Sequence, residues 1–141
     1  TRSLCDWSSD VCSSDLETPV VVAAGAGRAS RGGLKSGVPG DDFVPNPSAQ
    51  LYVRPSGAGP TAAQRRAVQG LPCVDCGAVT PKQVADHIEP LVVEYYRTGT
   101  IDTERQSAVT SVQARCPACS AIQGGQLSIF SSRMKKILGV K

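Results

Sequence analysis

Two short runs of sequence decide the fold: Cys-Val-Asp-Cys-Gly at residues 73–77 and Cys-Pro-Ala-Cys at residues 116–119. Each run is a Cys-x-x-Cys pair, which delivers two thiolates from one tight turn, and a tetrahedral zinc ion takes four such ligands. The glycine that follows the first pair suits a turn with a positive φ angle. We therefore expect one structural Zn²⁺ site, with ligands Cys73, Cys76, Cys116 and Cys119.

Other uses of Cys-x-x-Cys pairs compete with this interpretation. A redox pair normally occurs once, at the start of a helix in a thioredoxin-like βαβ unit, and the sequence pattern here does not predict one. A disulfide within either pair would be strained. The segment between the pairs, residues 77–115, is longer than the roughly 15–20 residues of a simple zinc ribbon. This length indicates a functional insertion between the two turns.

The composition offers little apolar material for a core. The chain has 141 residues, of which only 4% are aromatic, with 14 glycines and 10 prolines. Small domains with thin cores usually need a metal or disulfide staple. No apolar run is long enough to cross a membrane. The short run at residues 20–24, a candidate strand, lacks the basic flank of a signal peptide, so we expect no membrane partner.

The N-terminal part divides into two segments. Residues 1–16 resemble a translated sequencing-library adapter; we expect them to be an artefact and the natural protein to extend further upstream. A genuine Ser/Asp-rich tail is the alternative. If they are an artefact, Cys5 and Cys12 do not belong to the natural protein. Residues 17–60 are rich in Gly, Pro, Ala and Ser, which predicts a mostly disordered linker, with a short strand at 51–54.

Residues 61–139 are predicted to form a small α+β domain. Thr61 is a good helix N-cap before an Ala- and Arg-rich stretch, and the β-leaning run at 84–88 is followed by Pro90. Apolar residues near helical spacing indicate a C-terminal helix. The expected elements are a helix at 61–69, a strand at 84–88, a helix at 91–97, a short helix or extended lead-in at 107–113, and a helix at 128–138.

The charge of the chain is uneven. Residues 51–141 carry eleven Lys/Arg against six Asp/Glu, which favours an anionic partner such as nucleic acid, although a simple solubility excess explains it equally well. Arginine suits bidentate phosphate recognition, and no residue suggests base readout. The candidate phosphate contacts are Arg115, Arg133, Lys135 and Lys136; a solvated helix face is the alternative for each.

Asp86 and His87, the only histidine, lie between the two cysteine pairs. Alone, such a histidine is more often structural than catalytic. The order CxxC (73–76), DHIxPL (86–91) and VQxxCxxC (112–119), however, resembles that of the HNH (ββα-metal) nucleases over residues 61–139. The resemblance is closest to the C-terminal nuclease domains of bacterial polymorphic toxins.

This resemblance implies a zinc-stapled ββα-metal, treble-clef-like fold and an endonuclease that hydrolyses phosphodiester bonds of DNA, or of RNA, with little sequence specificity. By position, His87 corresponds to the general base and Asp86 to a ligand of a catalytic divalent metal (Mg²⁺, Mn²⁺ or Zn²⁺). The toxin branch implies a larger secreted or injected effector that acts in the target-cell cytoplasm, and an immunity protein as partner.

The sequence departs from the family pattern in two places. The family has an Asn near the VQxxC run, where this chain has Thr110 and Ser111. It has a metal-binding His or Asn directly after the last cysteine, where this chain has Ser120, a weak ligand; Gln123 could supply a carbonyl oxygen instead. Three alternatives therefore stay open: a degenerate inactive site, a non-catalytic zinc module that binds nucleic acid or protein, and a housekeeping or phage HNH nuclease.

Overall fold

Two short antiparallel strands form the sheet within the structure, a computed structural model that describes residues 33–141. Strand β2 (Val84–His87) pairs with β3 (Val112–Arg115), and Ala85 faces Ala114 across the pair. Both alanines are buried together with Val68. The expected strand at 84–88 is confirmed to within one residue.

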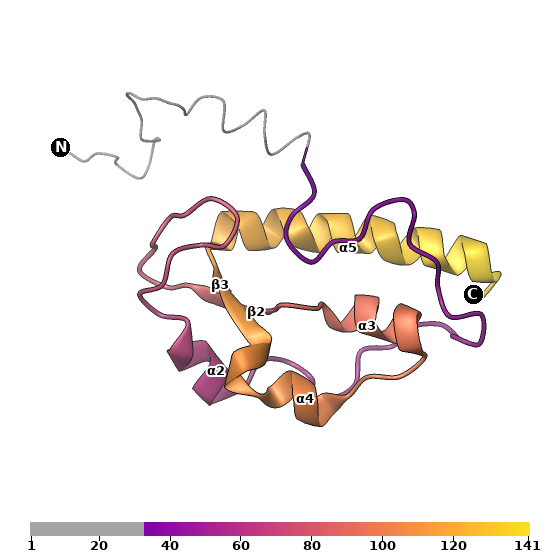
Figure 1. The fold of residues 1–141 in the computed structure, drawn as a ribbon, viewed down its shortest axis with the longest axis horizontal. Helices are drawn as coiled ribbons and strands as arrows, with labels where there is room; N and C mark the ends of the chain where they lie inside the picture. Colours follow the sequence, from indigo (N-terminus) through magenta and orange to yellow (C-terminus); the bar gives the residue numbers. More distant parts are fainter. Residues whose placement is uncertain (1–32) are drawn as a thin grey trace. The chain divides into compact units, whose positions relative to one another are not determined.

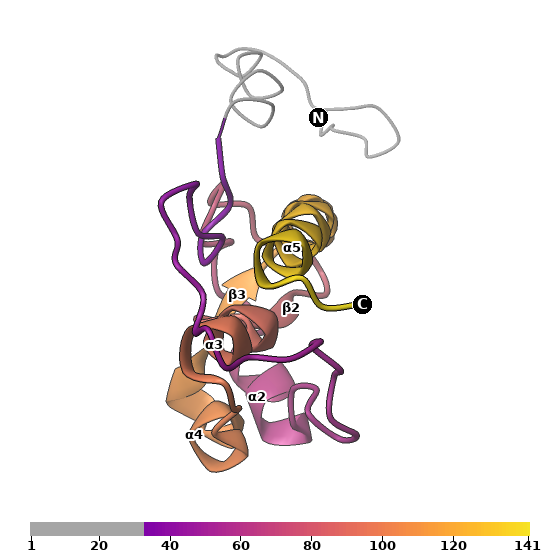
Figure 2. The same cartoon turned by 90° about the vertical axis from the view of Figure 1, so that its right-hand side faces the viewer.

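The long C-terminal helix α5 (Pro117–Leu138) lies on one side of the strands and of α3 (Leu91–Thr98), as Figures 1 and 2 show. The sequence prediction began this helix at 128, eleven residues too late. Proline is favoured at the first helical position, and Cys116 caps the helix with its sulfur. The intervening Gly124–Gly125 pair costs about 1 kcal/mol per residue relative to Ala but does not interrupt the helix.

Three shorter elements lie on the opposite side of the strands from α5 (Figures 1 and 2). Helix α2 (Ala62–Ala67) begins with a capping box, in which Thr61 and Gln64 each accept a hydrogen bond from the other's backbone N–H, so the predicted N-cap is confirmed. The 107–113 segment divides between the end of α4 (Thr103–Ser107), a 3-10 turn η1 (Val109–Ser111) and the start of β3.

The main apolar core lies between α3 and α5. Tyr96 and Met134 have no exposed surface, and Phe130 is 2% exposed. Aromatic rings pack edge to face here, with 5.0 Å between the centroids of Phe43 and Phe130. Ala49 completes the buried cluster, so the segment that precedes α2 is part of the core.

The prediction of a disordered linker at 17–60 is therefore wrong for its described part. The compact unit spans Lys35–Lys141 and not only residues 61–139. Asn46 explains part of this order, because its backbone N–H donates to Tyr96 (2.7 Å) and its side chain to the carbonyl of Thr98 (3.0 Å). No strand forms at 51–54, although Tyr52 packs against the core.

Several sequence predictions lie outside the described residues: the adapter-like segment 1–16, with Cys5 and Cys12, and the strand at 20–24. Among residues 33–141, no helix combines the length and the apolar character needed to cross a membrane.

Candidate metal centre and groove

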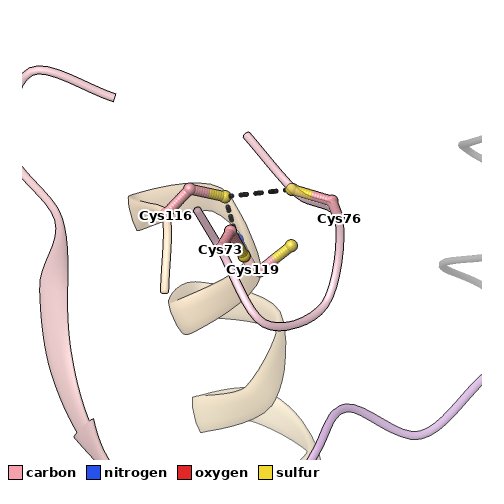
Figure 3. A group of neighbouring side chains, drawn as sticks. All are labelled: Cys73, Cys76, Cys116 and Cys119. Carbon is pink, nitrogen blue, oxygen red and sulfur yellow. Dashed lines mark hydrogen bonds between the residues drawn. The ribbon is translucent and has the colours of Figure 1, made fainter. Parts of the chain in front are cut away.

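The four predicted cysteines come together. Their sulfur atoms all lie within 4.8 Å of one another, and Sγ of Cys76 is 3.7 Å from Sγ of Cys116. Figure 3 shows one pair on a loop and the other at the start of α5, with the side chains facing each other. Cys73, Cys116 and Cys119 are buried, whereas Cys76 is exposed.

Local backbone contacts build both turns. In the first turn, the N–H of Gly77 donates to the carbonyl of Cys73 (2.8 Å), and Gly77 has a φ angle of 78°, which glycine adopts without strain. The N–H of Val74 donates to the carbonyl of Ala114 (2.9 Å), so this turn is fastened to β3. The second turn is the capped N-terminus of α5, where the N–H of Cys119 points at Sγ of Cys116 (3.4 Å).

The donor set fits a tetrahedral, thiophilic ion. With Zn–S bonds of about 2.3 Å, the edge of a tetrahedral ZnS₄ unit measures about 3.8 Å, close to the Cys76–Cys116 separation of 3.7 Å. Burial raises the pKa of Cys73, but hydrogen bonds from neighbouring backbone N–H groups outweigh burial and lower the pKa to about 6. Burial raises the pKa of Cys76 and of Cys119, so these thiols lose their protons only when a metal binds. A thiolate at neutral pH is the form that binds a metal. The four cysteines could thus hold a structural metal such as zinc.

Asp86 and His87 both border one groove, with a volume of about 760 Å³. Both residues lie within β2, whose side chains alternate between the two faces of the strand, and His87 also borders a second, smaller pocket together with Gln106. Gln123 and Leu127 of α5 contribute to the groove lining. Three of the predicted site residues, Asp86, His87 and Gln123, thus border the same groove.

Burial sets the protonation of His87, which is 8% exposed. Burial lowers the pKa of His87 below its usual 6.5; a hydrogen bond with the backbone of Gln106 opposes this, and the charge of Arg54 adds to it. The carbonyl of Gln106 also accepts from the buried side chain of Gln64 (2.7 Å). The imidazole is therefore neutral at pH 7, as a proton acceptor must be.

Arg115 does not serve as the predicted phosphate contact. Its side chain is 0% exposed and lies between two carboxylates, with Nε 2.8 Å from Asp75 and Nη1 3.3 Å from Asp86. A third contact runs from Nη2 to the carbonyl of Ser36 (3.1 Å). The prediction failed because a buried guanidinium needs compensating charge, and sequence alone did not reveal that Asp75 would face Arg115.

The two residues of α5 proposed as ligands of a catalytic metal, Gln123 and Ser120, differ from each other in position. Gln123 is buried and donates its amide N–H to the carbonyl of Ser36 (2.8 Å). Ser120 is half-buried and is not among the residues that border the groove. Among residues 33–141, the four cysteines are the only group of three or more His, Cys, Asp or Glu side chains arranged to hold a metal ion. Asp86 therefore belongs to no such group of three among these residues.

The remaining predicted phosphate contacts differ in their availability. Arg133 is engaged within the chain: it pairs with Asp41, donates to the carbonyl of Gly40 (2.8 Å) and lies 5.7 Å above the ring of Phe130. Lys135 and Lys136 take part in none of the ion pairs among the described residues, but neither borders the groove.

Sequence reasoning missed the hydrogen-bond network that joins the cysteine cluster to the groove. Ser36 donates its backbone N–H to Asp75 (2.9 Å) and accepts from both Arg115 and Gln123. Asp75 lies within the first cysteine turn, and that position was a signal that a charged partner would be needed. Nothing in the sequence pattern marked Ser36, which lies in the stretch predicted to be disordered.

Comparison of the chain with protein-family models, with curated proteins and with solved structures found no match in any of the three.

Proposed function

We propose that this chain is a zinc-stapled endonuclease of the HNH type that hydrolyses phosphodiester bonds of DNA. The observation that carries the proposal is the shared groove: Asp86 and His87, at the end of β2, border it together with Gln123 of α5. Helix α5 starts at the cysteine cluster and follows β3 directly. The antiparallel pair β2 and β3 followed by α5 matches the strand-strand-helix order that the resemblance implies, with α3, α4 and η1 inserted between the two strands.

His87 would act as the general base. A neutral imidazole accepts a proton from water as the water oxygen attacks phosphorus, and the bond from phosphorus to the 3′ oxygen breaks. The lowered pKa of His87 keeps the ring in its accepting form at neutral pH.

Asp86 would be the ligand of a catalytic divalent cation such as Mg²⁺, Mn²⁺ or Zn²⁺. When bound, such an ion supplies positive charge to the phosphate and to the leaving oxygen. The donor set only partly fits the ion, because Oδ2 of Asp86 already faces Arg115 and Ser120 does not border the groove.

This same contact favours a second candidate, a zinc module that binds nucleic acid or protein without cleaving it. In that case Asp86 is the structural counter-ion of the buried Arg115, and His87 is a buried side chain with no chemical role. The toxin context, with delivery into a target cell and an immunity protein, is a further proposal that rests on the family resemblance alone.

A plasmid-nicking assay on the full chain, purified with zinc, separates the two candidates. We expect the supercoiled form to be converted to nicked and linear forms in Mg²⁺ or Mn²⁺. His87→Ala should abolish the conversion while leaving the melting temperature and zinc content close to those of the unchanged protein. Asp86→Asn should reduce cleavage and make it require a higher metal concentration.

The matched control is Gln113→Ala. Gln113 is the strand neighbour that faces Asp86 in the register, yet it does not border the groove. This variant should cleave like the unchanged chain. Folded, zinc-loaded protein that leaves the plasmid intact with every metal would rule out the endonuclease and favour the binding module.

A further inference from the structure

The arginines and lysines of the described chain fall into two groups. Four arginines are held by ion pairs to carboxylates within the chain: Arg97, Arg105, Arg115 and Arg133. The other basic residues take part in none of these pairs. Because an ion-paired guanidinium has to give up its carboxylate to bind a phosphate, the unpaired residues are the better candidates for an external anion.

Three members of the unpaired group border the groove that contains Asp86 and His87: Arg54, Arg65 and Lys82. They come from three separate segments: the stretch before α2, α2 itself, and the residues that lead into β2. All three are exposed. Arg65 uses one N–H to hold the carbonyl of Pro60, which leaves other donors of its guanidinium for an anion.

The charge balance of the groove is positive. Asp86 is the only carboxylate among its lining residues, and Arg115 already faces that carboxylate from the protein interior. The charge of Arg54 is close enough to His87 to help lower the pKa of the imidazole. Exposed cations along the groove suit a chain of phosphates lying across it, since phosphate contacts position a nucleic acid without reading its sequence.

We propose that Arg54, Arg65 and Lys82 form the surface that seats the phosphodiester backbone of duplex DNA over His87, in place of the C-terminal basic residues that the sequence suggested. This inference rests on the proposed endonuclease for its ligand. It differs from the earlier expectation in that the cations belong to elements that precede β2, and Lys135 and Lys136 on α5 are not required.

Fluorescence anisotropy with a labelled mixed-sequence DNA duplex tests the surface. The full-length, zinc-loaded chain carries His87→Ala so that the probe stays intact, and affinity is measured as a function of salt concentration. The plot of log K against log salt has a negative slope, and each lost phosphate contact reduces the magnitude of this slope by about 0.9. The triple variant Arg54→Ala, Arg65→Ala, Lys82→Ala should therefore reduce the magnitude of the slope by about 2.7.

The chain supplies a matched control one residue away. Arg65 and Arg66 are both exposed on α2, but only Arg65 borders the groove. Arg65→Ala should reduce the magnitude of the slope by about 0.9, and Arg66→Ala should leave the slope unchanged. Equal effects of the two changes, or a larger effect from Lys135→Ala with Lys136→Ala than from the groove triple variant, would overturn the proposal.

The outcome also separates this surface from the proposed enzyme. If plasmid cleavage is absent but the groove variants weaken binding, the surface stands and the endonuclease falls. If cleavage is present and the groove variants bind like their parent, the surface falls and the endonuclease stands.

Discussion

Replacing Arg115 by methionine should destabilise the domain more than any other single arginine substitution. The side chain is 0% exposed, and its partners Asp75 and Asp86 have only 9% and 20% of their side-chain surface exposed. Methionine fills a similar volume but leaves both carboxylates without the guanidinium. Removing one partner of a buried ion pair typically costs about 3–5 kcal/mol.

That loss is large against the total stability of a domain, which is about 5–15 kcal/mol. For a domain of this size, each kcal/mol lowers the melting temperature by roughly 4–8 °C, so we expect Arg115→Met to melt about 12–40 °C below the unchanged chain. Circular dichroism melts and urea denaturation, both with zinc present, measure the loss. The control is Arg133→Met, whose partner Asp41 is fully exposed. An exposed pair contributes about 0–1 kcal/mol, and the contacts of Arg133 with the Gly40 carbonyl and the Phe130 ring add to the loss, which should stay below that of Arg115→Met.

A double-mutant cycle assigns the loss to the charge network. If Arg115 stabilises the fold by compensating Asp75, then Asp75→Asn should cost much less in the Arg115→Met background than in the unchanged chain. Equal losses in Arg115→Met and Arg133→Met, or strict additivity in the cycle, would refute the reasoning. Either result would mean that the buried contacts of Arg115 at 2.8 and 3.3 Å do not hold the first cysteine turn, through Asp75, to Asp86 of β2.

Three further predictions concern the fold and the site. Removing zinc with a chelator should abolish cooperative unfolding in calorimetry, because structural zinc contributes free energy comparable to the whole stability of a small domain; a cooperative melt of metal-free protein would contradict this. Met134→Ala should cost about 2–5 kcal/mol in urea denaturation, since Met134 is 0% exposed. Gly37→Ala should cost more than Gly57→Ala: both have positive φ, but only at Gly37 would the new methyl group lie 2.9 Å from a carbonyl oxygen.

A fourth prediction concerns pH. Burial lowers the pKa of His87 below 6.5 in the folded state, so the unfolded chain binds that proton more readily. The contribution of the neutral imidazole is full above the unfolded pKa and is lost as the pH falls below it. His87→Gln should therefore flatten the decline in unfolding free energy between about pH 7 and pH 5, and an unchanged slope would contradict the assignment.

The sequence was a good guide wherever structure depends on neighbours in the chain. The spacing within each Cys-x-x-Cys pair sets a turn, the Thr61 cap starts a helix, and both features appear as predicted. The start of α5 was missed because Gly124 and Gly125 look like a break in the sequence, whereas buried residues on both sides, such as Gln123 and Phe130, hold the helix through them.

Features that depend on distant partners could not be read from the sequence. Residues 35–50 have a composition typical of a disordered segment, yet Ala49 is buried in the core and Ser36 bridges Asp75, Arg115 and Gln123. Ordering such a segment costs conformational entropy, and it is the partners elsewhere in the fold that offset this cost. The basic residues show the same limit, because only the fold separates Arg115, buried in ion pairs, from Arg65 at the groove.

The buried network gives the four-cysteine cluster a consequence beyond stability. Asp75 lies between the two cysteines of the first turn, and Arg115 directly precedes the cysteine that caps α5. The ion pairs of Arg115 with Asp75 and Asp86 therefore connect the metal-binding turns to the carboxylate at the groove. Because Asp86 meets the guanidinium on its inner side, a shift of either turn would redirect its outer oxygen. Loss of zinc should thus disturb the groove even in a variant stabilised enough to stay folded without the metal.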